Sequence, residues 1–202
     1  VLLQFTVFPD YLDDWSTVQV ALTDITARKK AENYLEYLGK HDVLTKLYNR
    51  SFYIAELNRL ERNQLRPVSC IFIDLNGLKE LNDSIGHDAG DSILRRLGNI
   101  LNQLIQHTPY SASRIGGDEF VILLPGADDA ALQNCLQSLN ELLLVDNQFY
   151  SNQPMSISIG CATNELNERM DDMLKRADLD MYRQKKKYYL NKDRRIQSEI
   201  RN

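Results

Sequence analysis

Three acidic residues in two distant segments are the first candidates for chemistry. Asp74 ends the continuous apolar run at residues 68–73, and Asp118 and Glu119 directly follow two glycines. Carboxylates at strand ends on a rigid sheet suit hard divalent cations, and Mg²⁺ favours one or two carboxylates together with substrate phosphates. Because acidic residues are usually exposed, these three alone are weak evidence for a metal site. They gain meaning if the chain also binds a phosphate-bearing ligand.

The segment from Asp74 to Asp91 is rich in side chains that could bind a nucleotide. Asn82 offers a hydrogen-bond donor and an acceptor, Asp91 accepts two donors, and Lys79 offers a positive charge for phosphate. The guanine edge presents one acceptor, its O6 oxygen, and N–H donors beside it. An Asn and an Asp together complement that edge. The segment therefore suits a guanine nucleotide, although this match is not unique.

The two glycines, Gly116 and Gly117, lie between β-compatible flanks. This pattern predicts a tight hairpin whose turn residues take positive φ. Successive strand residues alternate between faces, so Asp118 and Phe120 should lie on one face and Glu119 on the other. For a generic Gly-Gly-Asp turn, the common outcome is an acidic tip in solvent. The role of this hairpin therefore depends on its surroundings.

The elements that must position these residues alternate between helix and strand. Besides the hairpin, the pattern predicts strands at residues 68–73 and 155–160, and helices at 51–64, 77–84, from 88 onwards, through 132–143 and at 171–189. Continuous apolarity at 68–73 indicates a central strand covered on both faces. This order favours an α/β sandwich with a central, mostly antiparallel sheet flanked by helices.

Ahead of this domain, the sequence predicts an N-terminal β-hairpin followed by a helix. The two strands are expected at residues 2–8 and 16–23. Asp24 can cap a helix over residues 25–39. Its apolar stripe would consist of Ile25, Ala31, Leu35 and Leu38. The helix could be a simple linker, or a short signalling helix that pairs with its copy in a dimer.

The composition is that of an ordinary soluble protein. The chain has 202 residues, 43% hydrophobic and 26% charged, which suits one domain with an appendage. A net charge of -4 disfavours a general nucleic-acid binder. No apolar run approaches the roughly 20 residues of a membrane span, and residues 1–8 lack the basic start of a signal peptide. We therefore expect a cytoplasmic protein with no membrane segment.

The three cysteines do not suggest a disulfide framework or a zinc site. Cys70, Cys135 and Cys161 are odd in number and lie far apart, without a Cys-x-x-Cys pair. We expect them to be reduced and buried.

Several segments resemble the diguanylate cyclase family. Residues 116–120, Gly-Gly-Asp-Glu-Phe, match its signature letter for letter, preceded by Arg114. Residues 41–50 resemble the start of the same domain, and residues 177–185 (Ala-Asp-x-x-Met-Tyr-x-x-Lys) match its closing motif. Residues 20–32 resemble the last strand and exit linker of PAS sensor domains. The resemblance implies a PAS-like remnant at residues 1–24, a linker helix at 25–40, a GGDEF domain at 41–190 and a tail at 191–202.

The resemblance implies a nucleotide-cyclase-like fold and a specific reaction. Two GTP molecules would condense into the bacterial second messenger cyclic di-GMP with release of pyrophosphate, with Mg²⁺ or Mn²⁺ as cofactor. Each domain would hold one GTP, so catalysis would require a homodimer controlled by the amino-terminal sensor. The ligand pocket of that sensor is expected to lie outside this sequence.

The resemblance also assigns roles to single residues. Asp74, the Leu75 carbonyl, Asp118 and Glu119 would hold the metal, and Asp118 or Glu119 would assist deprotonation of the attacking 3′-hydroxyl. The residues implied to bind the substrate are Asn82, His87 and Asp91 around guanine, Lys79 and Lys185 at the phosphates, and Gly116 and Gly117, where the backbone approaches the nucleotide. Without the resemblance, lysines ending the last helix would simply complement its dipole.

The sequence departs from the family pattern at several positions. Asn76 and Leu78 replace the common Asp and Phe, which are mild changes. Tyr189 stands where many members have a phosphate-contacting Arg, which puts triphosphate affinity in doubt. The product-inhibition motif Arg-x-x-Asp should fall at residues 107–110, which read His-Thr-Pro-Tyr. The primary inhibitory site is therefore predicted to be absent.

Two alternatives to an active cyclase remain open. One is a catalytically silent module that binds GTP or dimerises to relay a signal. The other is the cyclase-like half of a longer chain that ends in a cyclic di-GMP phosphodiesterase domain. Retention of Asp74, Asp118, Glu119, Asn82 and Asp91 favours the enzyme, because a silent relay has no need of all these side chains.

Overall fold

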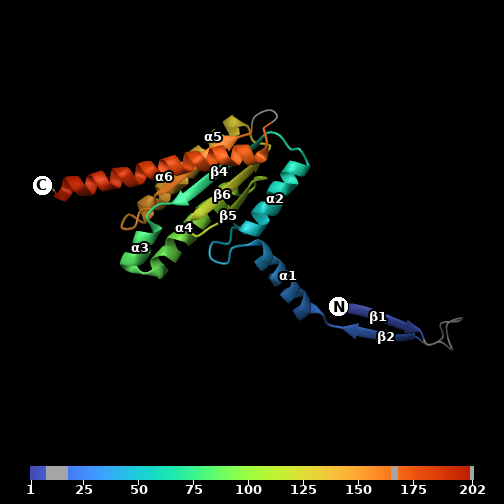
Figure 1. The fold of residues 1–202 in the computed structure, drawn as a ribbon. Helices are drawn as coiled ribbons and strands as arrows, with labels where there is room; N and C mark the ends of the chain where they lie inside the picture. The colour runs from blue at the N-terminus through green and yellow to red at the C-terminus, as the bar shows by residue number, and fades with distance from the viewer. Residues whose placement is uncertain (8–17, 165–167, 201–202) are drawn as a thin grey trace. The chain divides into compact units, whose positions relative to one another are not determined.

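The N-terminal unit, residues 1–39, consists of a hairpin and most of the first helix. The computed structural model describes residues 1–7, 18–164 and 168–200 (Figure 1). Strands β1 (Leu2–Val7) and β2 (Val18–Thr23) pair in antiparallel register, with Phe5 opposite Val20. The predicted strand ends at residues 8 and 16–17 lie outside the described residues.

Helix α1 (Thr26–Lys40) is shifted by one residue from the predicted helix at residues 25–39. The Asp24 carboxylate accepts a hydrogen bond of 2.8 Å from the Thr26 N–H, so the predicted cap is confirmed. No described residue of α1 is buried, and Leu35 is 67% exposed. Among the described residues, the helix thus carries exposed apolar side chains.

The second unit, residues 40–202, is built on a five-stranded sheet with the order β3-β5-β6-β4-β7. Its strands are β3 (Tyr48–Asn49), β4 (Val68–Leu75), β5 (Ser111–Arg114), β6 (Glu119–Pro125) and β7 (Ile157–Thr163). Only β3 and β5 pair in parallel, whereas all other described pairs are antiparallel. The predicted mostly antiparallel sheet is confirmed, and residues 68–73 form an interior strand between β6 and β7.

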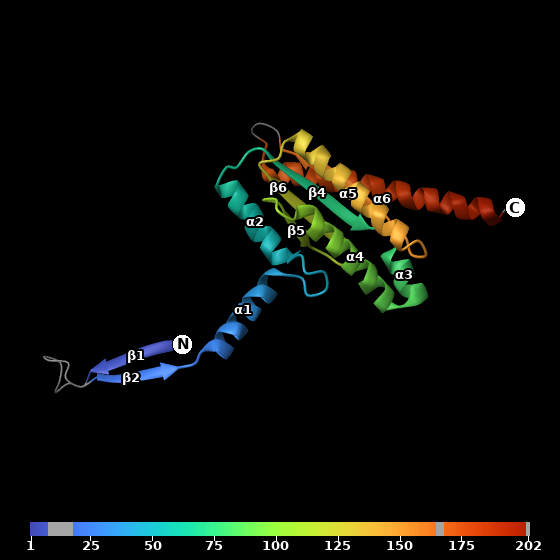
Figure 2. The same ribbon diagram turned by 180° about the vertical axis from the view of Figure 1, so that it is seen from behind.

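Helices cover both faces of this sheet. They are α2 (Arg50–Arg62), α3 (Leu78–Ile85), α4 (His87–Ile105), α5 (Asp129–Phe149) and α6 (Met170–Ile200). Phe120 and Ile122 of β6 join the cluster formed with α4 and α5. Val121 and Leu123 join the other, formed with α2 and α6. The predicted alternation is confirmed for residues 120–123. Asp118 differs from the prediction, because it precedes β6 and its carboxylate lies 3.7 Å from the Lys185 ammonium of α6. Figures 1 and 2 show the two helix layers from opposite sides.

Helix α6 is longer than predicted, since it continues past Tyr189 to Ile200. Residues 190–200 contain neither Gly nor Pro, so nothing in the local sequence stops the helix. Across the described residues, no helix is both long and apolar enough to cross a membrane.

All three cysteines are free. Burial raises the pKa of the Cys135 thiol to about 11 and that of Cys70 to about 12. The expectation of buried, reduced thiols holds for these two, whereas Cys161 is half-buried.

A close approach between β7 and α6 fixes the position of the last helix. Gly160 of β7 lies directly under α6, and a β-carbon at this position would overlap the Ala177 carbonyl oxygen and the Met181 backbone nitrogen. Because backbone atoms cannot move aside as a flexible side chain can, only glycine fits here.

Replacing this glycine should therefore destabilise the second unit. We expect Gly160→Ala to lower the free energy of unfolding by about 1–3 kcal/mol or more, the usual cost of overpacking. Gly117→Ala is the matched control, because a β-carbon there meets nothing within 4 Å. Urea unfolding monitored by circular dichroism measures both variants. Equal effects of the two substitutions would contradict this close packing.

Candidate active site

The end of β4 and the start of its neighbour β6 bring the three predicted acidic residues together. Asp74, near the end of β4, lies opposite Glu119 in β6, and the Leu75 N–H donates to the Asp118 carbonyl oxygen at 2.9 Å. Directly opposed residues of antiparallel strands point to the same face. The Asp74 and Glu119 side chains therefore share the face that α6 covers. The predicted convergence of these segments is confirmed.

Asp74 is a buried carboxylate with one oxygen unsatisfied. Only 2% of its surface is exposed. Lys185 of α6 donates to its Oδ2 at 2.6 Å, and the same ammonium lies 3.7 Å from the Asp118 carboxylate. Within the described part of the chain, the buried Asp74 Oδ1 has no hydrogen-bond partner. An unsatisfied buried oxygen is costly, which points to a ligand at this position.

The electrostatics of this pair follow from burial. Burial raises the pKa of the Asp74 carboxyl, the hydrogen bond from Lys185 lowers it, and the charge of Asp118 raises it again. The net result is a pKa above the usual 3.8. Burial alone would lower the pKa of the Lys185 ammonium, but its bond to Asp74 and the nearby negative charges raise it above 10.5. The site holds more negative charge than one lysine neutralises.

The donor set fits a magnesium ion that is bound together with a phosphate ligand. Among the described residues, no group of three or more His, Cys, Asp or Glu side chains is arranged to hold a metal alone. Mg²⁺ rarely needs such a cage, since one or two carboxylates and substrate phosphates usually suffice. The open Oδ1 of Asp74 and the neighbouring Asp118 carboxylate, 39% exposed, supply two such oxygens.

The loop between β4 and α3 is braced from β7. Asn76 is buried, and its side chain donates to the Ser156 hydroxyl at 3.1 Å and accepts from the Ser158 hydroxyl at 2.8 Å. The next residue, Gly77, has a φ of +74° and begins α3 without a side-chain cap. Its N–H donates to the Tyr189 hydroxyl at 3.4 Å. Asn76 therefore has a clear structural role in positioning this backbone.

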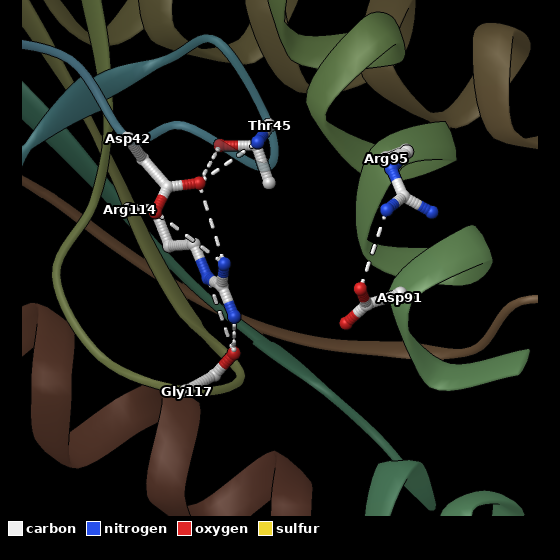
Figure 3. A network of polar contacts seen from close by, with 6 residues as sticks. All are labelled: Asp42, Thr45, Asp91, Arg95, Arg114 and Gly117. Atoms are coloured by element: carbon white, nitrogen blue, oxygen red, sulfur yellow. Dashed lines mark hydrogen bonds and ion pairs between the residues drawn. The ribbon is translucent and has the colours of Figure 1, made fainter. Parts of the chain in front are cut away.

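The predicted nucleotide-binding residues lie on the adjacent helices α3 and α4. Asn82 of α3 has a buried Oδ1 without a hydrogen-bond partner among the described residues. This oxygen lies so close to Gly90 of α4 that a β-carbon there would overlap it. Asp91, one residue further, accepts from Arg95 at 3.2 Å (Figure 3). Asn82 thus has an unsatisfied oxygen that lies against α4, and the Asp91 carboxylate lies on the same helix.

The other two predicted contacts on these helices are exposed. His87 is the first residue of α4, and Lys79 lies in the first turn of α3. The structure does not bring Lys79 to the carboxylates. Among the described residues, the cation that contacts both Asp74 and Asp118 is Lys185.

The signature hairpin differs from the predicted tight turn. β5 ends at Arg114 and β6 begins at Glu119, so residues 115–118 form the connection. Neither Gly116 nor Gly117 has positive φ, and the prediction that they do is wrong. Positive φ is a requirement of two-residue turns, whereas this connection is longer. A β-carbon at Gly116 would lie 2.5 Å from the Glu119 carboxylate, so a larger residue there would require the flexible Glu119 side chain to shift.

An ion pair holds this connection to the start of the domain (Figure 3). Arg114 donates to the Gly117 carbonyl oxygen at 2.7 Å and to the Asp42 carboxylate at 3.3 Å. Asp42 also accepts from the Thr45 N–H at 2.8 Å and the Thr45 hydroxyl at 2.7 Å. These contacts give Asp42, at the start of the domain, a structural role in holding the hairpin connection.

Sequence reasoning missed the bracing of the β4–α3 loop and the contact of Tyr189. Ser156 and Ser158 alternate in a strand pattern, which indicates a shared face, but nothing local says which residue they face. In the sequence, Tyr189 is notable only because it replaces the Arg of many family members. In the structure, its hydroxyl accepts a hydrogen bond from the backbone N–H of Gly77.

Comparison with known families decides what kind of domain this is. A family model described as "Diguanylate cyclase, GGDEF domain" matches residues 39–189, well over half of the chain. The chain belongs to the GGDEF domain family. The resemblance found in the sequence is thereby confirmed.

Curated relatives of this GGDEF protein are much longer chains. "Diguanylate cyclase DgcM" of Escherichia coli is 35% identical over 169 residues, covering 80% of this chain and 40% of that protein. "Signaling protein YkoW" of Bacillus subtilis is 28% identical over 201 residues, covering 92% of this chain and 25% of that protein. The chain thus spans less than half the length of both.

Solved GGDEF structures agree with the fold. A sensory box/GGDEF family protein from Caulobacter crescentus is 32% identical with a TM-score of 0.57, covering 73% of this chain and 99% of that one. A microbial GGDEF domain studied with cyclic di-GMP is 29% identical with a TM-score of 0.60, covering 75% of this chain and 93% of that one.

The raised pKa of Asp74 predicts that its charge destabilises the fold. A carboxyl whose pKa is higher in the folded than in the unfolded state loses stability as the pH rises above about 4 and through the folded value. We expect Asp74→Asn to be more stable than the parent at pH 7 by roughly 0.5–2 kcal/mol, as is common for stabilising substitutions. The difference should shrink toward acidic pH.

Urea unfolding at several pH values measures this difference. Asp193→Asn, on the exposed surface of α6, is the control and should stay within about 0.5 kcal/mol of the parent. If Asp74→Asn is less stable than the parent at pH 7, the bond to Lys185 outweighs burial and the electrostatic interpretation is wrong.

Proposed function

We propose that this chain contains the catalytic domain of a diguanylate cyclase, which condenses two GTP molecules into cyclic di-GMP and releases two pyrophosphates. The observation that carries the proposal is the buried Asp74 carboxylate, which has one unsatisfied oxygen, lies opposite Glu119 in the sheet and shares the Lys185 ammonium with Asp118. Membership of the GGDEF family and the name of the Escherichia coli relative support it. So does the cyclic di-GMP studied with one structural neighbour.

The acidic residues would hold Mg²⁺ or Mn²⁺. Asp74 and Asp118, with the Leu75 carbonyl oxygen and Glu119 beside them, are the candidate ligands. When bound, the metal would neutralise phosphate charge and lower the cost of forming an alkoxide. Asp118 or Glu119 would take the proton of the attacking 3′-hydroxyl. Both are more exposed than Asp74, so both can reach a substrate hydroxyl.

The substrate would lie across α3, α4 and the β4–α3 loop. Asn82 and Asp91 would recognise the guanine edge, with His87 nearby at the start of α4. The phosphates would bind Lys79 and Lys185. Gly116 and Gly117 leave room for the nucleotide beside the hairpin, where Gly117 is exposed and a β-carbon there would meet nothing within 4 Å.

Catalysis would require two copies of the chain. One domain offers one such site, and the two GTP molecules must face each other to form two phosphodiester bonds. Helix α1, with its exposed apolar side chains, is the natural contact between copies.

We assign residues 1–24 to a PAS-like sensor remnant, 25–40 to a signalling helix, 41–190 to the cyclase and 191–202 to its tail. A GTP-consuming enzyme with reduced cysteines belongs in the cytoplasm.

A silent GTP-binding or dimerisation relay is the second candidate. Two observations favour it: Tyr189 replaces an expected phosphate-binding Arg, and Lys185 is engaged by Asp74. The greater length of the relatives also leaves room for a phosphodiesterase domain in the whole protein.

Product formation separates these candidates. The purified dimer, incubated with GTP and Mg²⁺, should yield cyclic di-GMP detected by chromatography. Asp118→Asn should lower the rate by about 100-fold or more, as loss of a metal-binding or proton-accepting carboxylate typically does. Asp129→Asn, exposed at the start of α5, should keep the parental rate. Equal rates for parent and Asp118→Asn would refute the role of Asp118, and no product from any dimer would favour the relay.

Excess cyclic di-GMP should leave the rate nearly unchanged. Residues 107–110 lack the Arg and Asp of the inhibitory motif, and the Thr108 hydroxyl there is already bonded to the Ile105 carbonyl oxygen at 2.7 Å. Initial rates with and without added product provide the measurement. Strong non-competitive inhibition would show that this region, or another one, still binds the product.

A further inference from the structure

Two residues on one face of α6 contact the groups that a metal–nucleotide complex would need. Lys185 and Tyr189 are four positions apart, so they project from the same side of the helix. The Lys185 ammonium contacts the Asp74 carboxylate, and the Tyr189 hydroxyl contacts the Gly77 N–H. Lys192, one turn further, lies 3.5 Å from Glu80 of α3. This face of α6 therefore extends from the proposed metal ligand Asp74, the cation side of the site, to Gly77 before α3, the phosphate side.

At the cation side, Lys185 provides the positive charge that buried Asp74 requires. A carboxylate that is 2% exposed is costly without a cationic partner. The ammonium occupies Oδ2 at 2.6 Å and approaches Asp118 at 3.7 Å, so it bridges the two proposed metal ligands. The Lys185 side chain is nevertheless 29% exposed, which gives its ammonium a route to solvent.

At the phosphate side, Tyr189 provides an oxygen acceptor. Gly77 is the N-cap residue directly before α3, and no side chain caps this end of the helix. An uncapped helix start with free N–H groups attracts anionic oxygens. Here the neutral Tyr189 hydroxyl accepts from the Gly77 N–H, at 3.4 Å, a long and therefore weak bond. A phosphate oxygen would be a stronger acceptor at the same donor.

We propose that this face of α6 is an internal placeholder for the metal–nucleotide complex: Lys185 stands in for the metal cation at Asp74, and Tyr189 stands in for a phosphate oxygen at Gly77. Binding of the complex displaces both side chains. The ammonium of Lys185 then leaves the carboxylates and becomes available to a phosphate. This inference rests on the proposed function. The move of Lys185 from Asp74 to a phosphate would couple metal binding to nucleotide binding.

Metal binding without nucleotide tests the role of Lys185. We expect Lys185→Met to bind Mn²⁺ alone about tenfold more tightly than the parent, equivalent to about 1.4 kcal/mol, because a competing cation has been removed. Lys187→Met is the matched control, since it removes the same charge from an exposed position of α6 and should bind Mn²⁺ like the parent. Isothermal titration calorimetry gives the affinities. Equal affinities for the two variants would overturn the proposal.

A second measurement needs no variant. Acetylation of the parent protein with acetic anhydride, followed by mass spectrometry, reports the accessibility of each lysine. Lys185 should react several-fold faster when Mn²⁺ is added, because its ammonium leaves Asp74, whereas Lys187 should not change. Unchanged reactivity of Lys185 at saturating Mn²⁺ would show that the lysine is not displaced and would overturn the proposal.

The role of Tyr189 is tested by removing its hydroxyl. Tyr189→Phe should bind the α,β-methylene analogue of GTP with Mg²⁺ about two- to threefold more tightly, as expected for loss of one weak competing hydrogen bond. Tyr182→Phe, at an exposed position of the same helix, should bind like the parent. Weaker binding by Tyr189→Phe would mean that the hydroxyl contacts the phosphate directly. An unchanged affinity would mean that the hydroxyl does not compete with the phosphate. Either result would overturn the proposed role of Tyr189.

These measurements stand apart from product formation. If the chain makes no cyclic di-GMP but Mn²⁺ still displaces Lys185, the placeholder holds and the proposed activity fails. If cyclic di-GMP forms while Lys185 stays on Asp74 in the presence of Mn²⁺, the activity holds and the placeholder fails.

Discussion

The site depends on one electrostatic constraint, a carboxylate buried in an interior strand of the sheet. Asp74 lies between β6 and β7, where neighbouring strands and α6 exclude water from its side chain. A charge in such a place needs a positive partner or it becomes neutral. The last helix supplies that partner through Lys185, and one oxygen of Asp74 is left open. The pairing of Asp74 with Lys185 that stabilises the fold therefore competes with the binding of a metal to the same carboxylate.

Packing elsewhere keeps the competing groups in place. Helix α6 approaches β7 so closely at Gly160 that its axis has little freedom, and this contact sets where Lys185 and Tyr189 can reach. The hairpin with Asp118 and Glu119 is held from the other side by Arg114, which is itself held by Asp42. Both supports help to determine the distances between the charged groups.

The sequence predicts the scaffold better than the contacts of the site. The apolar run at residues 68–73, the alternation after Gly117 and the helical stripes depend on local periodicity, and all three correspond to elements of the structure. The bond between Lys185 and Asp74 joins residues 111 positions apart, so no local pattern could reveal it. The wrong prediction of positive φ at Gly116 and Gly117 had a similar cause. It assumed a two-residue turn, whereas strand pairing made the connection longer.

The most direct test is a crystal structure of the dimer with Mn²⁺ and the α,β-methylene analogue of GTP, with the metal located by anomalous scattering. Asp74 and Asp118 should both coordinate the manganese, and the Lys185 ammonium should lie on a phosphate oxygen instead of Asp74. Manganese bound away from Asp74, or Lys185 still paired with Asp74 beside a bound nucleotide, would contradict the central role of this buried carboxylate.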